Sequence, residues 1–263
     1  MMHVTETRAK AGAFRLAFRK GRGKRALDCW LALPAEAEAG APPLIALHGI
    51  ARDAEAQACA HAPGAAAAGR AVIAPLFDEA RWGGYQRVKP NRADRALLSL
   101  LDELEDEGLL ETRRFDLSGF SGGAQFAHRF AMLYPERVRR LTLAAPGFWT
   151  FPDEAPFPYG FGGEWGAKLA SGFDRMLGLD IAVFVGADDD QRDENMRAAP
   201  GIDAQQGPNR RARAGAWVAA LKAAAAERGL PAPRLSLTVA PGLGHDFDAC
   251  AADGALINLA HRG

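Results

Sequence analysis

The chain has 263 residues, of which 48% are hydrophobic and 24% are charged, the composition of a folded globular protein. Lysine and arginine together number 32, and aspartate and glutamate also number 32, so the formal net charge is zero. This balance provides no overall field that would attract nucleic acid or an anionic membrane, and a small neutral molecule is the expected partner.

The N-terminal 20 residues carry charges throughout, and no stretch reaches the ~18 apolar residues that a membrane span needs. The three cysteines, Cys29, Cys59 and Cys250, are far apart and lack a CxxC spacing. This pattern indicates neither a disulfide framework nor a zinc site. We therefore expect a cytoplasmic protein without a bound metal.

Alternating apolar positions predict an antiparallel hairpin near the N-terminus. Its strands fall at 14–18 and 27–33, and a basic turn at 20–25 joins them. The run from Leu44 to Leu47 differs, because four consecutive apolar residues are typical of a strand that is buried on both faces.

Similar short apolar runs then alternate with helical patterns. The further strands are expected at 71–74, 115–117, 141–144, 181–185 and 235–239. The helices are expected from Asn91 to just before Gly108, from about 123 to 134, and from about 211 to 228. Strands that alternate with helices predict right-handed crossovers and a mostly parallel sheet that is covered on both sides, within a single domain over 1–263.

One segment breaks this rhythm, because seven of the 22 aromatic residues lie between Phe148 and Trp165. We expect positions 148–172 to form a short lid over an apolar site. Ordinary packing of a long loop is the alternative. The rings expected to line the substrate pocket are Trp149, Phe151, Tyr159 and Trp165.

The clearest chemical motif is Gly119-Phe-Ser-Gly-Gly123, which matches G-x-S-x-G between an apolar strand and a helix. A serine on such a tight turn is strained, and the glycines on either side allow the close packing that exposes its Oγ. The N-terminus of the helix directs free N–H groups toward an oxyanion formed there. We interpret Ser121 as a nucleophile, with a chance match in a glycine-rich turn as the alternative.

Such a serine needs a general base, and six histidines could supply one. His245 follows the apolar strand at 235–239 and so lies on a loop at the carboxyl end of a strand. The other five lie near the chain ends, within helices or in a strand-end turn: His3, His261, His61, His128 and His48. His245 is therefore the expected base, and His48 is interpreted as a turn-forming or hydrogen-bonding residue.

The acid should lie between the two, since the chain order in this architecture is serine, acid, histidine. The strand at 181–185 runs into Gly186-Ala-Asp-Asp-Asp190. Side chains alternate in direction along an extended exit, so Asp189 points away from Asp188 and Asp190, and one direction faces His245. Asp193 and Asp246 are further candidates. Calcium binding is disfavoured, because no glycine bend and no glutamate stand at calcium-loop spacing.

Two backbone N–H groups are expected to bind the oxyanion. Gly122 follows the nucleophile, and Ile50 lies in the Leu47-His-Gly-Ile-Ala51 turn at the same sheet edge.

Taken together, these motifs resemble those of the α/β-hydrolase superfamily from Leu44 nearly to the C-terminus. They occur in the family's order: His48-Gly49, Gly119–Gly123, Gly186–Asp189 and Gly244-His245-Asp246. The resemblance implies an eight-stranded, mostly parallel sheet flanked by helices, and the opening hairpin agrees with the family's antiparallel first strands. It also favours Asp189 as the acid, through the spacing Gly-x-x-Asp.

Within the superfamily, the chain looks similar to compact carboxylesterases and to dienelactone-hydrolase-like and polyester-depolymerase-like enzymes. Dienelactone hydrolases use a cysteine where this chain has Ser121, and the HGGG motif of some esterases is absent because Ile50 follows Gly49.

The resulting expectation is a serine esterase that cleaves a small-molecule carboxylic ester through an acyl-enzyme and needs no cofactor. An amidase, peptidase or thioesterase is the alternative enzyme, and a catalytically dead binding or scaffold protein is the non-enzyme alternative. Nucleic-acid binding is disfavoured by the zero net charge and by a helical spacing that suits an exposed face, for Arg210, Arg211, Arg213 and Lys222. The acyl group, the alcohol and the oligomeric state stay open.

Overall fold

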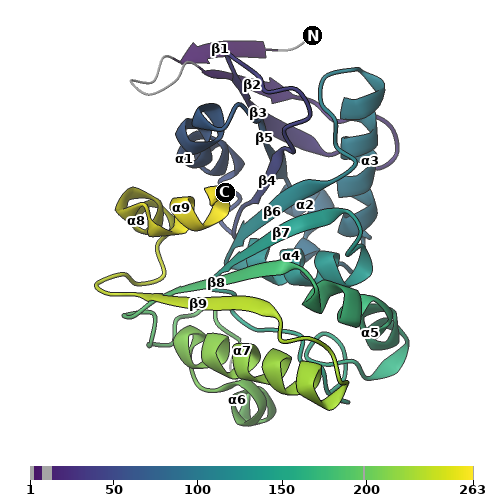
Figure 1. Ribbon diagram of the computed structural model, residues 1–263, viewed down its shortest axis with the longest axis vertical. Helices are drawn as coiled ribbons and strands as arrows, with labels where there is room; N and C mark the ends of the chain where they lie inside the picture. Colours follow the sequence, from purple (N-terminus) through teal and green to yellow (C-terminus); the bar gives the residue numbers. More distant parts are fainter. Residues whose placement is uncertain (1–2, 8–13, 198, 263) are drawn as a thin grey trace.

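The computed structural model describes residues 3–7, 14–197 and 199–262. Its strands are β1 (His3–Thr7), β2 (Phe14–Arg19), β3 (Asp28–Pro34), β4 (Leu44–Leu47), β5 (Val72–Leu76), β6 (Phe115–Phe120), β7 (Val138–Ala144), β8 (Asp180–Gly186) and β9 (Arg234–Ala240). They form one sheet in the order β1-β2-β3-β5-β4-β6-β7-β8-β9 (Figure 1). The pairs from β1 to β5 are antiparallel, and those from β5 to β9 are parallel.

Strands β2 to β9 are the eight-stranded, mostly parallel sheet that the sequence predicts, and β1 adds a ninth strand at the edge. The hairpin is confirmed, with Leu16 opposite Ala32 in the β2–β3 register. The N-terminal strand was not predicted. A strand at a sheet edge is held by backbone hydrogen bonds on one side, so it does not require a strong apolar pattern.

Helices cover both faces of this sheet (Figure 1). They are α1 (Ala54–Ala67), α2 (Glu79–Trp82), the 3₁₀ helix η1 (Tyr85–Arg87), α3 (Ala93–Asp106), α4 (Gly122–Leu133), α5 (Gly163–Leu177), α6 (Pro200–Gln206), α7 (Arg210–Glu227), α8 (Phe247–Asp253) and α9 (Ala255–His261). Helices α1, α8 and α9 contact one another on one face, whereas α4, α5 and α7 lie together on the other. No helix of the described ranges combines the length and the hydrophobicity that crossing a bilayer requires.

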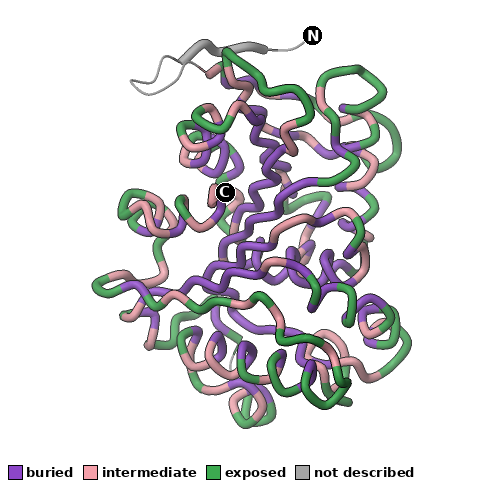
Figure 2. The backbone as a smooth tube through the Cα atoms, viewed as in Figure 1, coloured by how far each residue is buried: buried purple, intermediate pink, exposed green. Residues whose placement is uncertain are grey.

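The core forms two apolar layers against the central strands, which run as a buried band through the molecule (Figure 2). Under α1 the layer consists largely of small side chains, which let the helix approach the sheet closely: Ala54, Ala58, Ala62 and Ala65 pack on Leu16, Ala32, Ala46, Val72 and Ala74. The opposite layer is larger and contains the apolar stripe of α3: Leu97, Leu100, Leu101 and Leu104. Each fully buried leucine contributes roughly 1.5–3 kcal/mol relative to an exposed one.

Candidate active site

Ser121 occupies a sharp turn between β6 and α4. Its backbone has φ 51° and ψ −114°, a strained combination for a residue with a side chain. The Ser121 N–H donates to the Ala144 carbonyl oxygen at 2.8 Å, which fixes the turn against the end of β7. A Cβ at Gly123 would lie 2.2 Å from the Leu47 carbonyl oxygen, and one at Gly119 would lie 2.4 Å from the Gly123 carbonyl carbon. Both glycines of the motif are therefore required for this close packing.

A chain of hydrogen bonds joins the three residues singled out in the sequence. His245 Nε2 lies 3.0 Å from Ser121 Oγ, and His245 Nδ1 lies 2.9 Å from Asp189 Oδ2. Asp189 is 3% exposed and has no proton to donate when ionised, so it accepts from Nδ1–H. The bare Nε2 then accepts the hydroxyl proton of Ser121, which is the arrangement in which a histidine can act as a base toward a serine.

Backbone contacts between two loops hold the acid and the histidine together. The Asp188 N–H donates to the Leu243 carbonyl oxygen at 2.9 Å, and the Ala187 N–H donates to the Ala240 carbonyl oxygen at 2.8 Å. The approach is so close that a Cβ at Gly186 would lie 2.0 Å from the Leu243 oxygen. The position of His245 is thus set by the end of β8 as well as by its own strand, β9.

One aromatic ring stacks on His245, and a second supports that ring. The Phe120 ring stacks on the imidazole with 5.0 Å between centroids, and Phe247 meets Phe120 edge-on at 5.5 Å. These contacts restrict rotation of the imidazole, which keeps Nε2 directed toward Ser121.

Ile50 and Gly122 lie side by side at the turn. A Cβ at Gly122 would be 3.4 Å from the Ile50 nitrogen, and one at Gly49 would be 3.4 Å from Ser121 Cβ. Gly122 is the first residue of α4, so its N–H has no partner within the helix. The two amides are therefore placed next to the serine as the sequence predicts, in positions suited to hydrogen-bonding an oxyanion.

His48 has a structural environment rather than a catalytic one. Its Nε2 accepts from the Phe77 N–H at 3.0 Å, which places the ring proton on Nδ1, 2.6 Å from the Gly49 carbonyl oxygen. Burial lowers the pKa of His48 to about 4. The Tyr85 hydroxyl, buried beneath the turn, donates to the His48 carbonyl oxygen. Tyr85 and His48 together fix the turn that carries Ile50, and no motif in the sequence indicates the contribution of Tyr85.

No protein-family model matches the chain, and no curated protein matches it significantly. Among solved structures, a poly(aspartic acid) hydrolase from a Sphingomonas species superimposes with a TM-score of 0.79 at 22% identity, covering 94% of this chain and 98% of that one. A poly(3-hydroxybutyrate) depolymerase from Bordetella parapertussis gives 0.79 at 24% identity, covering 94% and 89%. The chain has the α/β-hydrolase fold.

A more distant α/β-hydrolase structure, an S-formylglutathione hydrolase from Agrobacterium tumefaciens, superimposes with a TM-score of 0.59 at 14% identity and covers 99% of both chains. These identities establish the fold, and a fold supports many chemistries.

The sequence analysis missed Arg210, a charged neighbour of the site. This arginine is 1% exposed at the start of α7, and its Nη1 donates to Asp189 Oδ1 at 3.1 Å. The same guanidinium binds both carboxylate oxygens of Asp193, at 2.6 and 3.0 Å, and thereby lowers the pKa of that carboxyl. The sequence offered no signal for this contact, because Arg210 lies in a basic helical segment that was interpreted as solvent-exposed.

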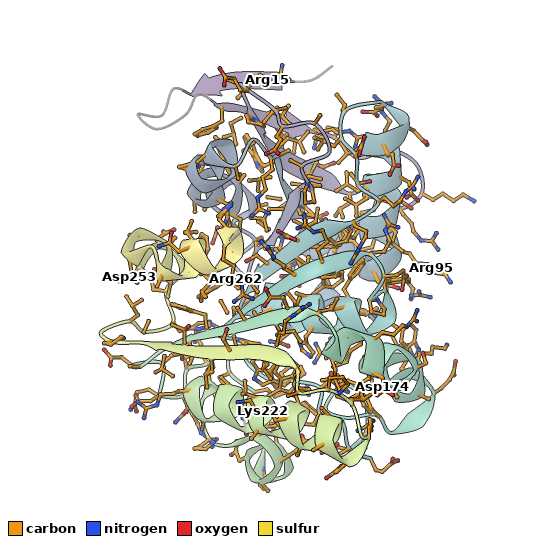
Figure 3. The ribbon with its side chains drawn as sticks, viewed as in Figure 1. Arg15, Arg95, Asp174, Lys222, Asp253 and Arg262 are labelled. Carbon is orange, nitrogen blue, oxygen red and sulfur yellow. The ribbon has the colours of Figure 1, made fainter. Side chains whose placement is uncertain are left out.

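That interpretation of the basic segment is wrong for two of its four members. Arg210 and Arg213 are fully buried and bind carboxylates and carbonyl oxygens inside the molecule. Arg211 is exposed but lies 3.4 Å from Asp190, and Lys222 projects from the outer side of α7 (Figure 3). The segment therefore presents no continuous basic face.

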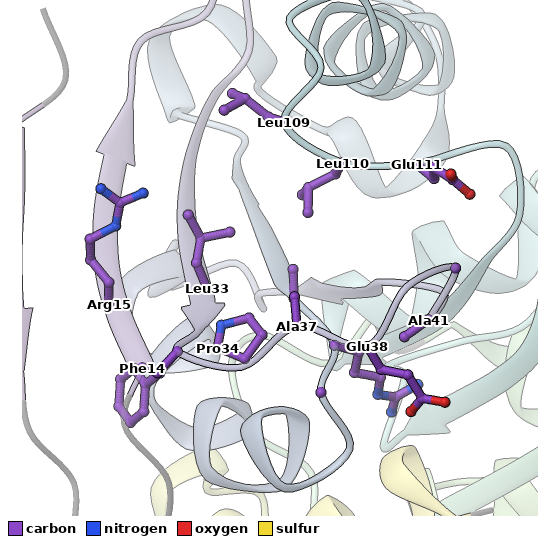
Figure 4. A pocket seen from close by; sticks show the side chains of 15 residues that line it. Phe14, Arg15, Leu33, Pro34, Ala37, Glu38, Ala41, Leu109, Leu110 and Glu111 are labelled. Carbon is purple, nitrogen blue, oxygen red and sulfur yellow. The ribbon is translucent and has the colours of Figure 1, made fainter.

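The candidate site opens into a cavity of about 310 Å³ beside Ser121. It is lined by Gly49, Ile50, Ala51, Asp53, Gln57, Phe120, Ser121, Asn195, His245, Asp246, Phe247 and Asp248. A larger cavity of about 630 Å³ lies elsewhere, between the N-terminal strands and the loop after α3 (Figure 4). Its described lining residues include no serine, cysteine or histidine, so the smaller cavity is the one next to the reactive groups.

The aromatic segment does not form the expected roof over this cavity. None of Trp149, Phe151, Tyr159 and Trp165 is among the described residues that line it. Trp149 is fully buried and stacks on Trp217 with 4.1 Å between ring centroids. Positions 163–172 of the expected lid belong to helix α5.

Hydrogen bonds to buried polar side chains explain why this segment turns inward. Arg129 of α4 donates to Thr150 Oγ1 at 2.9 Å and to the Pro158 carbonyl oxygen at 3.2 Å. The Gln206 side chain binds the backbone of Trp149 from the other side. Its Oε1 accepts from the Trp149 N–H at 2.9 Å, and its Nε2 donates to the Trp149 carbonyl oxygen at 3.1 Å. Polar side chains that are distant in sequence thus satisfy the segment's backbone and draw its rings into the core.

Proposed function

We propose that this chain is a serine hydrolase that cleaves carboxylic esters through an acyl-enzyme intermediate. The observation that carries the proposal is the continuous chain of hydrogen bonds from Ser121 Oγ through His245 to buried Asp189. It is supported by the strained turn at Ser121 and by the two amides beside it. The structural neighbours named above include a depolymerase of a polyester and a hydrolase of a thioester, which agrees with acyl transfer from an oxygen or sulfur leaving group.

In the acylation step, Ser121 Oγ attacks the ester carbonyl while His245 Nε2 takes the hydroxyl proton. The carbonyl oxygen becomes an oxyanion, which accepts hydrogen bonds from the N–H groups of Ile50 and Gly122. Each such donor contributes a few kcal/mol to the transition state. His245 then gives its proton to the departing alcohol, and Asp189 stabilises the imidazolium throughout.

Deacylation repeats the same steps with water. His245 removes a proton from a water molecule, which attacks the acyl-Ser121 carbonyl, and the second oxyanion uses the same two amides. Collapse of this intermediate breaks the bond to Ser121 Oγ and releases the acid. The proton held by His245 returns to Ser121, so the site is regenerated without a cofactor.

Labelling and kinetics test the proposal. The protein should react with a fluorophosphonate at Ser121 and hydrolyse short p-nitrophenyl esters, and Ser121→Ala should lose both properties. Because nucleophile and base act as a unit, kcat should fall by several orders of magnitude, and His245→Ala should match this loss. Ser171→Ala, on the exposed side of α5, is the matched control and should behave as the parent.

The proposal fails if Ser121→Ala keeps more than about a tenth of the activity, a loss of no more than ~1.4 kcal/mol of transition-state stabilisation. Rates measured with amide and thioester substrates of the same acyl group, in the same assay, show which leaving group the enzyme prefers. Absence of both labelling and turnover would favour a binding protein instead.

A further inference from the structure

The cavity beside Ser121 is rimmed by negative charge. Three of its lining residues are aspartates, Asp53, Asp246 and Asp248, and no lysine or arginine occurs among its described lining residues. This local excess contrasts with the zero net charge of the whole chain. The excess of negative charge is therefore a property of the cavity and not of the protein surface in general.

The three carboxylates are not neutralised by neighbouring cations. In the described part of the chain, none of them takes part in an ion pair within 4.0 Å. Asp246 caps α8 by accepting from the Ala249 N–H at 2.9 Å, whereas Asp53 precedes α1 without a side-chain capping bond. All three residues are exposed and line the cavity, so their carboxylates make its surroundings negative.

The nearest arginines are directed elsewhere. Arg52, next to Asp53 in the chain, pairs with Glu79 and donates to the Phe77 carbonyl oxygen. Arg210 is buried and donates through Nη1 and Nη2 to Asp189 and Asp193. A substrate in the cavity consequently meets the aspartates without a compensating guanidinium.

A buried amide adds a second, independent sign of a ligand. Gln57 is 2% exposed and lines the cavity from α1, and within the described residues its side chain makes no hydrogen bond. The amide atoms are reachable from the cavity, where a polar group of a bound molecule can donate to the oxygen or accept from the nitrogen. Ile50, 41% exposed, provides an apolar wall in the same cavity.

We propose that the preferred substrates are esters carrying an ammonium or guanidinium group near the reacting carbonyl, and that anionic esters are excluded. This inference rests on the proposed ester hydrolysis. The carboxylates attract the cation, and Gln57 accepts or donates a hydrogen bond to the polar part of the same molecule. The charge of this cavity opposes a polyanion such as poly(aspartic acid), the polymer named for the Sphingomonas hydrolase that shares this fold.

Two series of matched esters measure the charge preference. The first compares p-nitrophenyl esters of 6-aminohexanoic, hexanoic and adipic acid, which at pH 7 place a positive, neutral or negative group at the same distance. The second compares acetylcholine with its uncharged analogue, 3,3-dimethylbutyl acetate. We expect kcat/KM to fall at least about tenfold from the cationic to the anionic member, and the ratio to shrink in 0.5 M salt as the charges are screened.

Variants then trace the preference to the aspartates. The double variant Asp53→Asn/Asp248→Asn should reduce the cationic-to-anionic ratio by about fivefold or more, with thermal unfolding to verify the fold. Asp102→Asn, exposed on α3 and outside the cavity, is the charge-matched control and should leave the ratio unchanged.

The outcomes separate this inference from the proposed function. Equal rates across the charge series, or faster anionic esters, would overturn the charge preference while Ser121-dependent hydrolysis of the neutral ester stands. A ratio that survives in the double variant would overturn the assignment to the aspartates. Absence of both hydrolysis and fluorophosphonate labelling at Ser121 would remove both proposals together.

Discussion

Arg210 and His245 hold opposite oxygens of one carboxylate. The guanidinium donates to Asp189 Oδ1 at 3.1 Å, and the imidazole Nδ1 lies 2.9 Å from Oδ2. Asp193 binds the same guanidinium, sharing Nη1 with Asp189 and also accepting from Nη2, so the two carboxylates and one arginine carry a net negative charge next to the histidine. Arg210 therefore orients Asp189, while Asp193 prevents the arginine from cancelling its charge.

Arg210→Met should destabilise the protein by about 3–5 kcal/mol, since it leaves Asp189 buried without its ion-pair partner. Arg211→Met is the matched control, because Arg211 is exposed and its pairing with Asp190 is worth less than about 1 kcal/mol. Urea unfolding measures both changes. Equal effects of the two substitutions would show that the buried pair does not depend on Arg210.

Asp189→Asn should retain the fold and fluorophosphonate reactivity to some degree, but lower kcat by up to ~10⁴, because an amide cannot hold the imidazole tautomer or stabilise the imidazolium. Asp188→Asn and Asp190→Asn should cost less than about tenfold, since neither side chain contacts His245. Steady-state kinetics on a p-nitrophenyl ester compares the three variants. A large loss of kcat in Asp188→Asn, together with a nearly unchanged kcat in Asp189→Asn, would contradict the geometry of the site.

Trp149→Ala should affect stability and not substrate selectivity. The side chain is fully buried against Trp217, and removing such a ring costs about 3–5 kcal/mol. Trp165→Ala, at a partly buried position, should cost less. In either variant, the KM values for butyrate and octanoate esters should change equally. A KM increase for the octanoate ester alone would instead support the expected lid.

Stability should fall as the pH drops from about 6.5 toward 4. Burial lowers the pKa of His48 to about 4, of His61 to about 3 and of His261 to about 4. These histidines bind protons more readily in the unfolded chain, where the pKa is about 6.5, so acid favours unfolding. Each contributes up to ~1.4 kcal/mol per pH unit over this window, and the contribution is fully present above it.

Urea unfolding at pH 7.5, 6 and 5 measures this loss. His61→Gln should flatten the pH dependence, because it removes one of the buried groups. A free energy of unfolding that stays constant between pH 7.5 and 5 would contradict the prediction.

The parts of the fold that the sequence predicted are those set by local patterns. The apolar runs became β4 to β9 close to their expected bounds. Strands β4, β5, β6 and β8 are buried almost throughout, as continuous apolar runs predict, whereas β9 is an edge strand and is largely exposed. The G-x-S-x-G turn was recognisable for a similar reason, since its glycines are dictated by contacts that a Cβ would prevent. Asp189 was favoured only through the family spacing, because three consecutive aspartates satisfy the pattern equally.

The parts that were missed depend on contacts between distant segments. Nothing in the neighbourhood of Arg210 reveals that an acid 21 residues earlier meets it in the core. The aromatic segment likewise looks like a surface lid in sequence, and its inward course depends on Arg129 and Gln206, which lie outside it. Polar partners that satisfy buried backbone are the kind of information that periodicity does not contain.

The backbone bonds between the β8 exit and the loop before His245 close the chain between acid and base into a ring. The 56-residue separation of Asp189 and His245 is bridged by main-chain atoms at Asp188 and Leu243, whatever lies between. Helices α6 and α7 could therefore lengthen or acquire an inserted domain at the exposed turn 229–232 while the acid and the base keep their spacing.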